Sequence, residues 1–254
     1  MNNKEYQDLD QIAERFSSKG YLDSNTSNVE DPGGWTINAR MTGFSFRTMR
    51  PYFKGSTCLE VACADGEMTG NLLKHFDRVV AFDGSQTQID RLNDNITNSK
   101  LETHVALMED FKTNELFSTI VVSYVLEHVE DSIESLKHIK QFLAPGGVIL
   151  VVVPNGSSIH RMIALEMGLI KSLTEFSPGD IFSGHRRTYL PETLKSDIVA
   201  SGLKYIALEG ILFKPLSQKQ MEDWFTDEML EGFYLTGKKF PKLCSSMLIV
   251  AENV

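Results

Sequence analysis

Residues 58–70, CLEVACADGEMTG, place an apolar run, an acid and a series of small residues directly before a predicted helix. Small residues after a buried strand are typical of a loop whose backbone closely approaches a bound ligand. The dinucleotide template G-x-G-x-x-G fits poorly, because laid on Ala62 and Ala64 it puts an acid at its third glycine. A two-residue spacing of Glu60, Ala62, Ala64 and Gly66 fits better.

Alanine at two positions of this loop restricts its backbone. A residue with a Cβ takes positive φ only at a cost, so we expect negative φ at Ala62 and Ala64 and a loop slightly displaced from its ligand. By itself the loop is also compatible with an ordinary strand-to-helix turn.

Apolar strands and amphipathic helices alternate along the middle of the chain. Strands are predicted at 57–63, 78–83, 102–108, 117–126 and 148–154, with helices at 67–76, 85–96 and 132–143. Strands this continuously apolar predict a Rossmann-like, doubly wound α/β sheet with its ligand at the strand carboxyl ends. Two later strands, 203–213 and 245–253, bring the sheet to seven and are expected to form an antiparallel edge pair.

The remaining segments suggest a single domain, 1–254, with additions to its core. Residues 155–190 begin with a Met-rich stretch and continue as a Ser/Pro/Gly-rich loop. This segment is too long for a simple connection, so we expect it to form a lid. We expect an N-terminal helical extension (1–50), a cofactor-binding core (51–154), an acceptor lid (155–190) and a C-terminal part of the sheet (191–254).

Composition excludes several classes of partner. The net charge of −9 gives no support for nucleic-acid binding, which uses clustered Lys and Arg. The longest apolar run, VILVVV, is too short to span a bilayer, so no membrane partner is expected. Three cysteines without metal-site spacing suggest reduced thiols and a cytoplasmic protein.

Two further stretches point to one family. Asp83 ends the second strand about 20 residues after the first loop, where an acid can accept both ribose hydroxyls of a nucleoside, and Gly84 leaves room beside it. The long stretch 117–155 closely resembles the strand-four to strand-five segment of class I S-adenosylmethionine-dependent methyltransferases of small molecules, including the ubiquinone-type O-methyltransferases. The loop 60–66 resembles their E-x-G-x-G-x-G motif with two glycines changed to alanine. The resemblance covers about 56–155 well and 184–203 loosely.

The resemblance implies S-adenosylmethionine as cofactor and S-adenosylhomocysteine as product. In this family the loop after the third strand borders the adenine, and in this sequence that loop is MEDF, residues 108–111. Arg40, together with Trp35, is a candidate for closing over the methionine carboxylate. The expected cofactor-binding residues are Glu60, Ala62, Ala64, Gly66, Asp83, Gly84, Met108, Glu109, Asp110, Ser123, Tyr124 and Arg40.

Histidines supply the candidate catalytic groups. His128 follows the fourth strand, and is either a base or a residue that orients the loop. His185 and Tyr189 lie in the stretch SGHRRTY, whose two arginines either bind an anionic acceptor or are simply solvated. The ubiquinone-type relatives hold a divalent metal with an acid and a histidine, here Glu127 and His128, and with an earlier acid, whose position is Tyr124 in this sequence. Because this third ligand is missing, we expect no metal, and we expect turnover to survive chelation.

The expected function is methyl transfer to oxygen or nitrogen of a small metabolite, with the His185 cluster favouring an anionic one. Two alternatives stay open: a catalytically silent binding or regulatory protein, which the alanines of the loop would suit, and a methyltransferase acting on RNA or protein. The acidic charge, and SYVL in place of N-P-P-[YF] after the fourth strand, disfavour the latter. The acceptor and the oligomeric state do not follow from the sequence.

Overall fold

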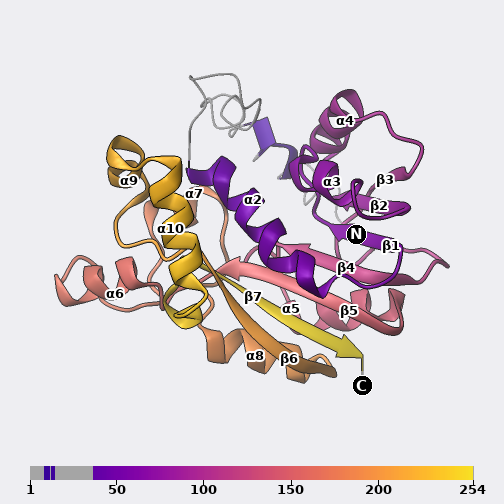
Figure 1. Cartoon of the computed structure of the whole chain (residues 1–254). Coiled ribbons are helices and arrows are strands. Elements are labelled where there is room, and N and C mark those ends of the chain that lie inside the picture. The colour runs from indigo at the N-terminus through magenta and orange to yellow at the C-terminus, as the bar shows by residue number, and fades with distance from the viewer. Residues whose placement is uncertain (1–8, 12, 15–36, 254) are drawn as a thin grey trace.

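A seven-stranded mixed sheet organises the molecule (Figure 1). The computed structural model describes residues 9–11, 13–14 and 37–253. The strands are β1 (Thr57–Val61), β2 (Arg78–Asp83), β3 (Leu101–Val105), β4 (Phe117–Ser123), β5 (Leu143–Pro154), β6 (Leu203–Ile211) and β7 (Ser246–Asn253). Their order is β3-β2-β1-β4-β5-β7-β6. The first five pair in parallel, while β7 runs antiparallel to both β5 and β6. The Rossmann-like fold with an antiparallel edge is therefore confirmed.

Helices cover both faces of this sheet. They are α2 (Ile37–Met49), α3 (Glu67–Leu72), α4 (Gln86–Asn95), α5 (Ser132–Ile139), α6 (Ile159–Glu166), α7 (Pro178–Phe182), α8 (Pro191–Ala200), α9 (Gln218–Trp224) and α10 (Asp227–Gly237). Short 3-10 turns follow α2 and α5 and precede β7. The helix expected at 132–143 is shorter in the structure, because the 3-10 turn Lys140–Phe142 ends α5 and β5 begins at Leu143.

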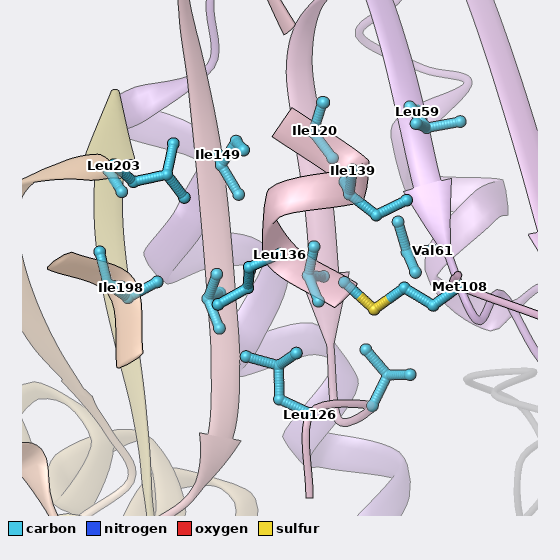
Figure 2. Packing of buried hydrophobic residues seen from close by; sticks show 14 of the residues in the cluster. Leu59, Val61, Met108, Ile120, Leu126, Leu136, Ile139, Ile149, Ile198 and Leu203 are labelled. Carbon is cyan, nitrogen blue, oxygen red and sulfur yellow. The ribbon is translucent and has the colours of Figure 1, made fainter. Parts of the chain in front are cut away.

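Side chains alternate between two apolar layers with the period of two that a strand imposes. In β5, Ile149 and Val151 join one buried cluster, whereas Leu150 and Val152 join the other. The first cluster is covered by α5 and α8, and Figure 2 shows Leu136 of α5 among the strand side chains. The second is covered by α2, α3, α9 and α10. Both faces of the central strands are thus buried, which explains their unbroken apolar sequence.

Segments outside the alternating core also pack against the sheet. Helix α2 buries Ile37, Phe44 and Met49 against the same face as α10, and Figure 1 shows these two helices on the side of the sheet opposite α5 and α8. The helix predicted before β1 is confirmed from Ile37 onward, whereas Trp35 lies outside the described residues. No described helix has the length and apolarity needed to cross a bilayer.

Candidate active site

The loop after β1 adopts the conformation that its alanines were expected to prevent. Ala62 has φ 56° and Ala64 has φ 48°, so the prediction of negative φ was wrong. Hydrogen bonds hold the strained loop: Cys63 N donates to Phe82 O (3.1 Å) and Ala64 N to Asp83 Oδ2 (3.0 Å). These contacts offset a cost of about 1–2 kcal/mol for each left-handed residue. The loop therefore keeps a glycine-like path without two of its glycines.

Asp83 joins this loop to the start of α4. Its Oδ1 accepts a hydrogen bond from Ser85 N (2.8 Å), while Oδ2 accepts from Ala64 N. Burial raises the pKa of Asp83, although the two backbone amides favour the ionised form. Each carboxylate oxygen has a further lone pair, so the side chain holds the loop and can still accept hydrogen bonds from a ligand.

Glu60 connects the two elements on either side of the loop, β1 and α3. It is buried inside β1, and Thr69 Oγ1 donates to its Oε2 at 2.6 Å. Burial raises the pKa of Glu60 to about 8, and the nearby Asp83 adds to the shift. Glu60 is therefore a positioning residue that ties β1 to α3.

A cavity of about 1160 Å³ opens at the carboxyl ends of β1, β2 and β4. This volume exceeds that of most small-molecule sites, and it leaves room for a cofactor with a second molecule. Predicted site residues that line the cavity are Ala62, Ala64, Asp83, Gly84, Met108, Glu109, Tyr124, His128 and His185. Those outside its lining are Glu60, Gly66, Asp110, Ser123, Arg40 and Tyr189.

Two of the outlying residues have other roles. Arg40 Nη2 forms an ion pair with Asp227 Oδ2 (2.9 Å), which joins α2 to α10. Tyr189 is buried in the core, where its hydroxyl donates to Asp197 Oδ2 at 3.0 Å. Neither residue lines the cavity, so this geometry gives no support to the expected cofactor contact of Arg40 or to the expected catalytic role of Tyr189.

Beyond β4 the chain turns sharply and delivers Glu127 and His128 to the cavity. Tyr124 begins this turn at φ 57°, with its N–H donating to Val152 O (2.8 Å) and its hydroxyl 3.1 Å from Ser45 Oγ. A bulky residue at positive φ is strained, and such strain is often found at functional sites.

The segment before α8 is clamped onto the same turn. Arg187 Nη1 donates to the carbonyls of Leu126 and Val129, each at 2.6 Å, and Nη2 donates to Glu130 O at 2.7 Å. The neighbouring Arg186 N donates to the backbone carbonyl of Glu127 (2.8 Å). Arg187 is therefore a clamp for the loop, and the clamp sets His185 beside His128, with ring centroids 4.7 Å apart.

Three titratable side chains meet at this point: Glu127, His128 and His185 form what we term the post-β4 trio. Glu127 is 1% exposed, and neither of its carboxylate oxygens has a hydrogen-bond partner among the residues that the structure describes. Burial raises the pKa of Glu127 to about 7, whereas burial lowers the pKa of His128 to about 4. At neutral pH the trio thus holds a neutral imidazole beside a carboxyl group close to its titration point.

Outer contacts orient both imidazoles. His128 is hydrogen-bonded to the backbone of Ser183 and Gly184. His185 Nδ1 lies 3.0 Å from Asp180 Oδ1. Burial acts to raise the pKa of Asp180, but the hydrogen bonds from His185 and Ser177 outweigh it and lower that pKa. An ionised carboxylate behind an imidazole fixes its tautomer and strengthens it as a base.

The post-β4 trio also bears on the metal that the family resemblance implies. One ligand atom from each of its residues lies within 4.8 Å of the other two, so His185 adds a third ligand to the two expected from the sequence. Magnesium prefers oxygen ligands, however, whereas two imidazoles with one carboxylate suit a transition metal. The residues therefore do not fit magnesium.

Four cavity residues carry chemistry that the sequence did not reveal: Glu67, His160, Asp180 and Lys214. Burial raises the pKa of Glu67 to about 7, at the start of α3. A capping box, in which Ser177 and Asp180 exchange hydrogen bonds, is the one local signal that could have located Asp180. Lys214 follows an edge strand, and nothing local in its sequence predicts that it faces the site.

The comparisons with known proteins agree with this geometry. A family model described as a methyltransferase domain matches residues 37–208. The mitochondrial ubiquinone biosynthesis O-methyltransferase of Homo sapiens is 26% identical over 170 residues, 64% of this chain but only 45% of that protein. The Dinoroseobacter shibae ubiquinone biosynthesis O-methyltransferase is 24% identical, over 74% of this chain and 75% of its own length.

Among solved structures, an S-adenosylmethionine-dependent methyltransferase from Mesorhizobium loti has the same fold. Its TM-score is 0.61 at 14% identity, covering 85% of this chain and 99% of that one. The family model spans well over half of the chain, and its match agrees with the sheet order and the position of the cavity. The chain belongs to the methyltransferase domain family and is an S-adenosylmethionine-dependent methyltransferase.

Proposed function

We propose that the protein transfers the methyl group of S-adenosylmethionine to an oxygen or nitrogen of a small anionic metabolite in the cytoplasm. One observation carries the proposal: a single cavity is lined both by Asp83 and by the post-β4 trio. A nucleoside-binding carboxylate and a proton-accepting cluster thus share one cavity. The sequence relatives, named as O-methyltransferases, favour oxygen as the methylated atom.

In this proposal the cofactor occupies the end of the cavity formed by β1 to β3. Asp83 accepts the ribose hydroxyls, and Met108 and Glu109 border the adenine. The left-handed backbone at Ala62 and Ala64 lets the loop approach the cofactor closely, as the family motif does with glycines. This conformation removes the main reason for suspecting a silent binding protein.

The acceptor faces the post-β4 trio. Its nucleophilic atom displaces the sulfonium in line, so that the S–CH₃ bond breaks as the new bond to carbon forms, leaving S-adenosylhomocysteine. The cofactor is already activated, and the protein mainly positions the acceptor and excludes water. A hydroxyl acceptor passes its proton to His185, the imidazole that Asp180 orients, and the carboxyl group of Glu127 lies close beside it.

Residues 155–190 form the acceptor lid in this proposal. The N-terminal extension (1–50) and the cofactor-binding core (51–154) precede the lid, and the C-terminal part of the sheet (191–254) follows it. The segment leaves β5 at the cavity edge, contributes His185 and Asp180 to the lining, and is held by the Arg187 clamp. Its length exceeds what a connection to α8 requires.

Two measurements test the function. Calorimetry should detect S-adenosylhomocysteine binding, and S-adenosylmethionine with a deuterated methyl group, incubated with a fractionated metabolite extract, should give a product with a matching mass shift. An extract passed through an anion exchanger should lose the acceptor. Absence of cofactor binding at millimolar concentration would contradict the proposal.

A further inference from the structure

The acceptor end of the cavity contains a positive charge that the protein leaves uncompensated. Lys214, just after β6, lines the cavity and is half-buried. Within the described part of the chain its ammonium has no hydrogen bond or ion pair, although Asp180, Arg161 and Glu222 are near enough to affect it electrostatically. A partly desolvated ammonium that faces a cavity without a protein partner is available to bind an anion there.

The nearest carboxylates are committed elsewhere. Asp180 accepts hydrogen bonds from Ser177 N (2.7 Å) and pairs with His185. Glu222 Oε1 accepts from Ile37 N and from Gln218 Nε2, each at 2.9 Å. Neither carboxylate lies within ion-pair distance of Lys214, so the ammonium remains available to an anion in the cavity.

The other cations of this region differ from Lys214. Arg161 Nε donates to Leu173 O (3.2 Å), and its guanidinium also contacts Glu175 O and Asp180. The guanidinium of Arg187 already donates hydrogen bonds to three backbone carbonyls. Arg186 also lines the cavity, but it is exposed to solvent. Lys214 is therefore the cation best placed to select an acceptor inside the cavity.

His160 of α6 adds a second polar group at the same place. Its ring is hydrogen-bonded to the backbone of Lys214, while Nδ1 is buried and has no partner in the described ranges 9–11, 13–14 and 37–253. Burial, with the charges of Lys214 and Arg161, lowers the pKa of His160 to about 3, so the ring is neutral. Its free nitrogen can accept a hydrogen bond, which a hydroxyl or amine next to an anionic group would donate.

We propose that Lys214 binds the anionic group of the methyl acceptor, a carboxylate or a phosphate-like group, and that His160 accepts a hydrogen bond from a neighbouring hydroxyl or amine. This inference rests on the proposed function and names the substrate class of the same site. It assigns anion selection to Lys214 after β6, whereas the sequence pattern had suggested the arginines beside His185.

The test uses the whole protein saturated with S-adenosylhomocysteine and three probes of similar size: benzoate, phenylphosphonate and neutral benzamide. The wild type should bind at least one anion at least tenfold more tightly than benzamide by calorimetry. Lys214→Met, which keeps most of the side-chain volume, should weaken that anion at least tenfold, whereas Lys214→Arg should retain part of the affinity. Preference between the two anions identifies a carboxylate or a phosphate-like acceptor.

Lys219→Met provides a matched control, since Lys219 is exposed on α9. It should bind the anions like the wild type, and both methionine variants should bind S-adenosylhomocysteine normally, which shows that they are folded. Equal anion affinity in Lys214→Met and the wild type overturns the inference, as does a wild type that does not discriminate anions from benzamide. Failure to bind S-adenosylhomocysteine would instead contradict the proposed function itself.

Discussion

The two ends of the cavity are built in different ways. The cofactor end comes from three neighbouring strands and short loops, and its shape depends on backbone conformation: Ala62 and Ala64 at positive φ, held by Asp83. The acceptor end comes from distant segments, and its character depends on side chains without a hydrogen-bond or ion-pair partner among the described residues: the buried Glu127 and the half-buried Lys214.

Because of this difference, we expect the cofactor end to tolerate substitutions and the acceptor end to determine which molecule is bound. The loop at the cofactor end tolerates alanine in place of glycine, because the hydrogen bonds that hold it are donated by backbone N–H groups, which both residues have. At the acceptor end, a bound molecule has to complement polar side chains that have no protein partner, so a change of residue alters which molecule can be bound. Substitutions at the first end should change cofactor affinity or stability, and substitutions at the second should change turnover.

The largest expected effect is at the acceptor end. His185→Ala removes the imidazole that Asp180 orients and should lower turnover of a hydroxyl acceptor about a hundredfold, the usual scale for loss of a general base. Affinity for S-adenosylhomocysteine should hardly change. His75→Ala, an exposed histidine, serves as the control in the same assay. If cofactor affinity fell while turnover at saturation persisted, His185 would belong to the cofactor end.

At the cofactor end, Asp83→Ala should weaken S-adenosylhomocysteine binding by about 1–3 kcal/mol, because the ribose hydroxyls lose their acceptor. The free energy of unfolding should fall by less than this, although Ala64 N also loses a partner. Calorimetry and urea unfolding measure the two effects. Asp77→Ala, an exposed acid ahead of β2, should alter neither. Unchanged cofactor affinity in Asp83→Ala would remove the ligand assignment.

Stability should depend on pH through Glu60. Burial raises its folded-state pKa from 4.5 to about 8, so the folded protein binds the proton more tightly than the unfolded chain does. The resulting stability is complete below pH 4.5 and is lost as the pH rises through about 8. Between pH 5 and pH 8 the wild type should lose at least about 1 kcal/mol more than Glu60→Gln, measured by urea unfolding. Parallel pH profiles would show that Glu60 does not titrate in this range.

Relief of backbone strain should have a smaller effect. Ala62→Gly and Ala64→Gly remove the Cβ at positive φ but increase the entropy of the unfolded chain, so each should raise the free energy of unfolding by up to about 1 kcal/mol. Ala200→Gly at the end of α8, where φ is not positive, should instead destabilise the protein. Destabilisation by all three glycines would contradict the left-handed loop.

Chelation should have no effect on turnover, since the cofactor is already activated and the post-β4 trio does not fit magnesium. Turnover is compared before and after treatment with EDTA, with magnesium and zinc added back separately. Loss of turnover that zinc restores would instead show that Glu127, His128 and His185 hold a transition metal.

Local sequence predicted much of the fold because its signals are local. The apolar strands, the helix expected at 85–96 and the antiparallel pair at the end of the chain were all recovered. The positive φ at Ala62 and Ala64 was missed because alanine by itself disfavours it. The stabilising hydrogen bonds come partly from β2, about 20 residues later, and single-residue preferences do not include them.

The sequence by itself determined the sheet, the family and the position of Asp83 beside the first loop, because each depends on neighbouring residues and on fixed strand geometry. Only the tertiary structure decided the acceptor end. The Arg187 clamp places His185 beside Glu127 and His128, and the turn after β6 sets Lys214 beside His160. The physical reason is that desolvation and the pairing of charges depend on every segment around a side chain, so burial, free charge and shifted pKa values arise only when distant segments meet.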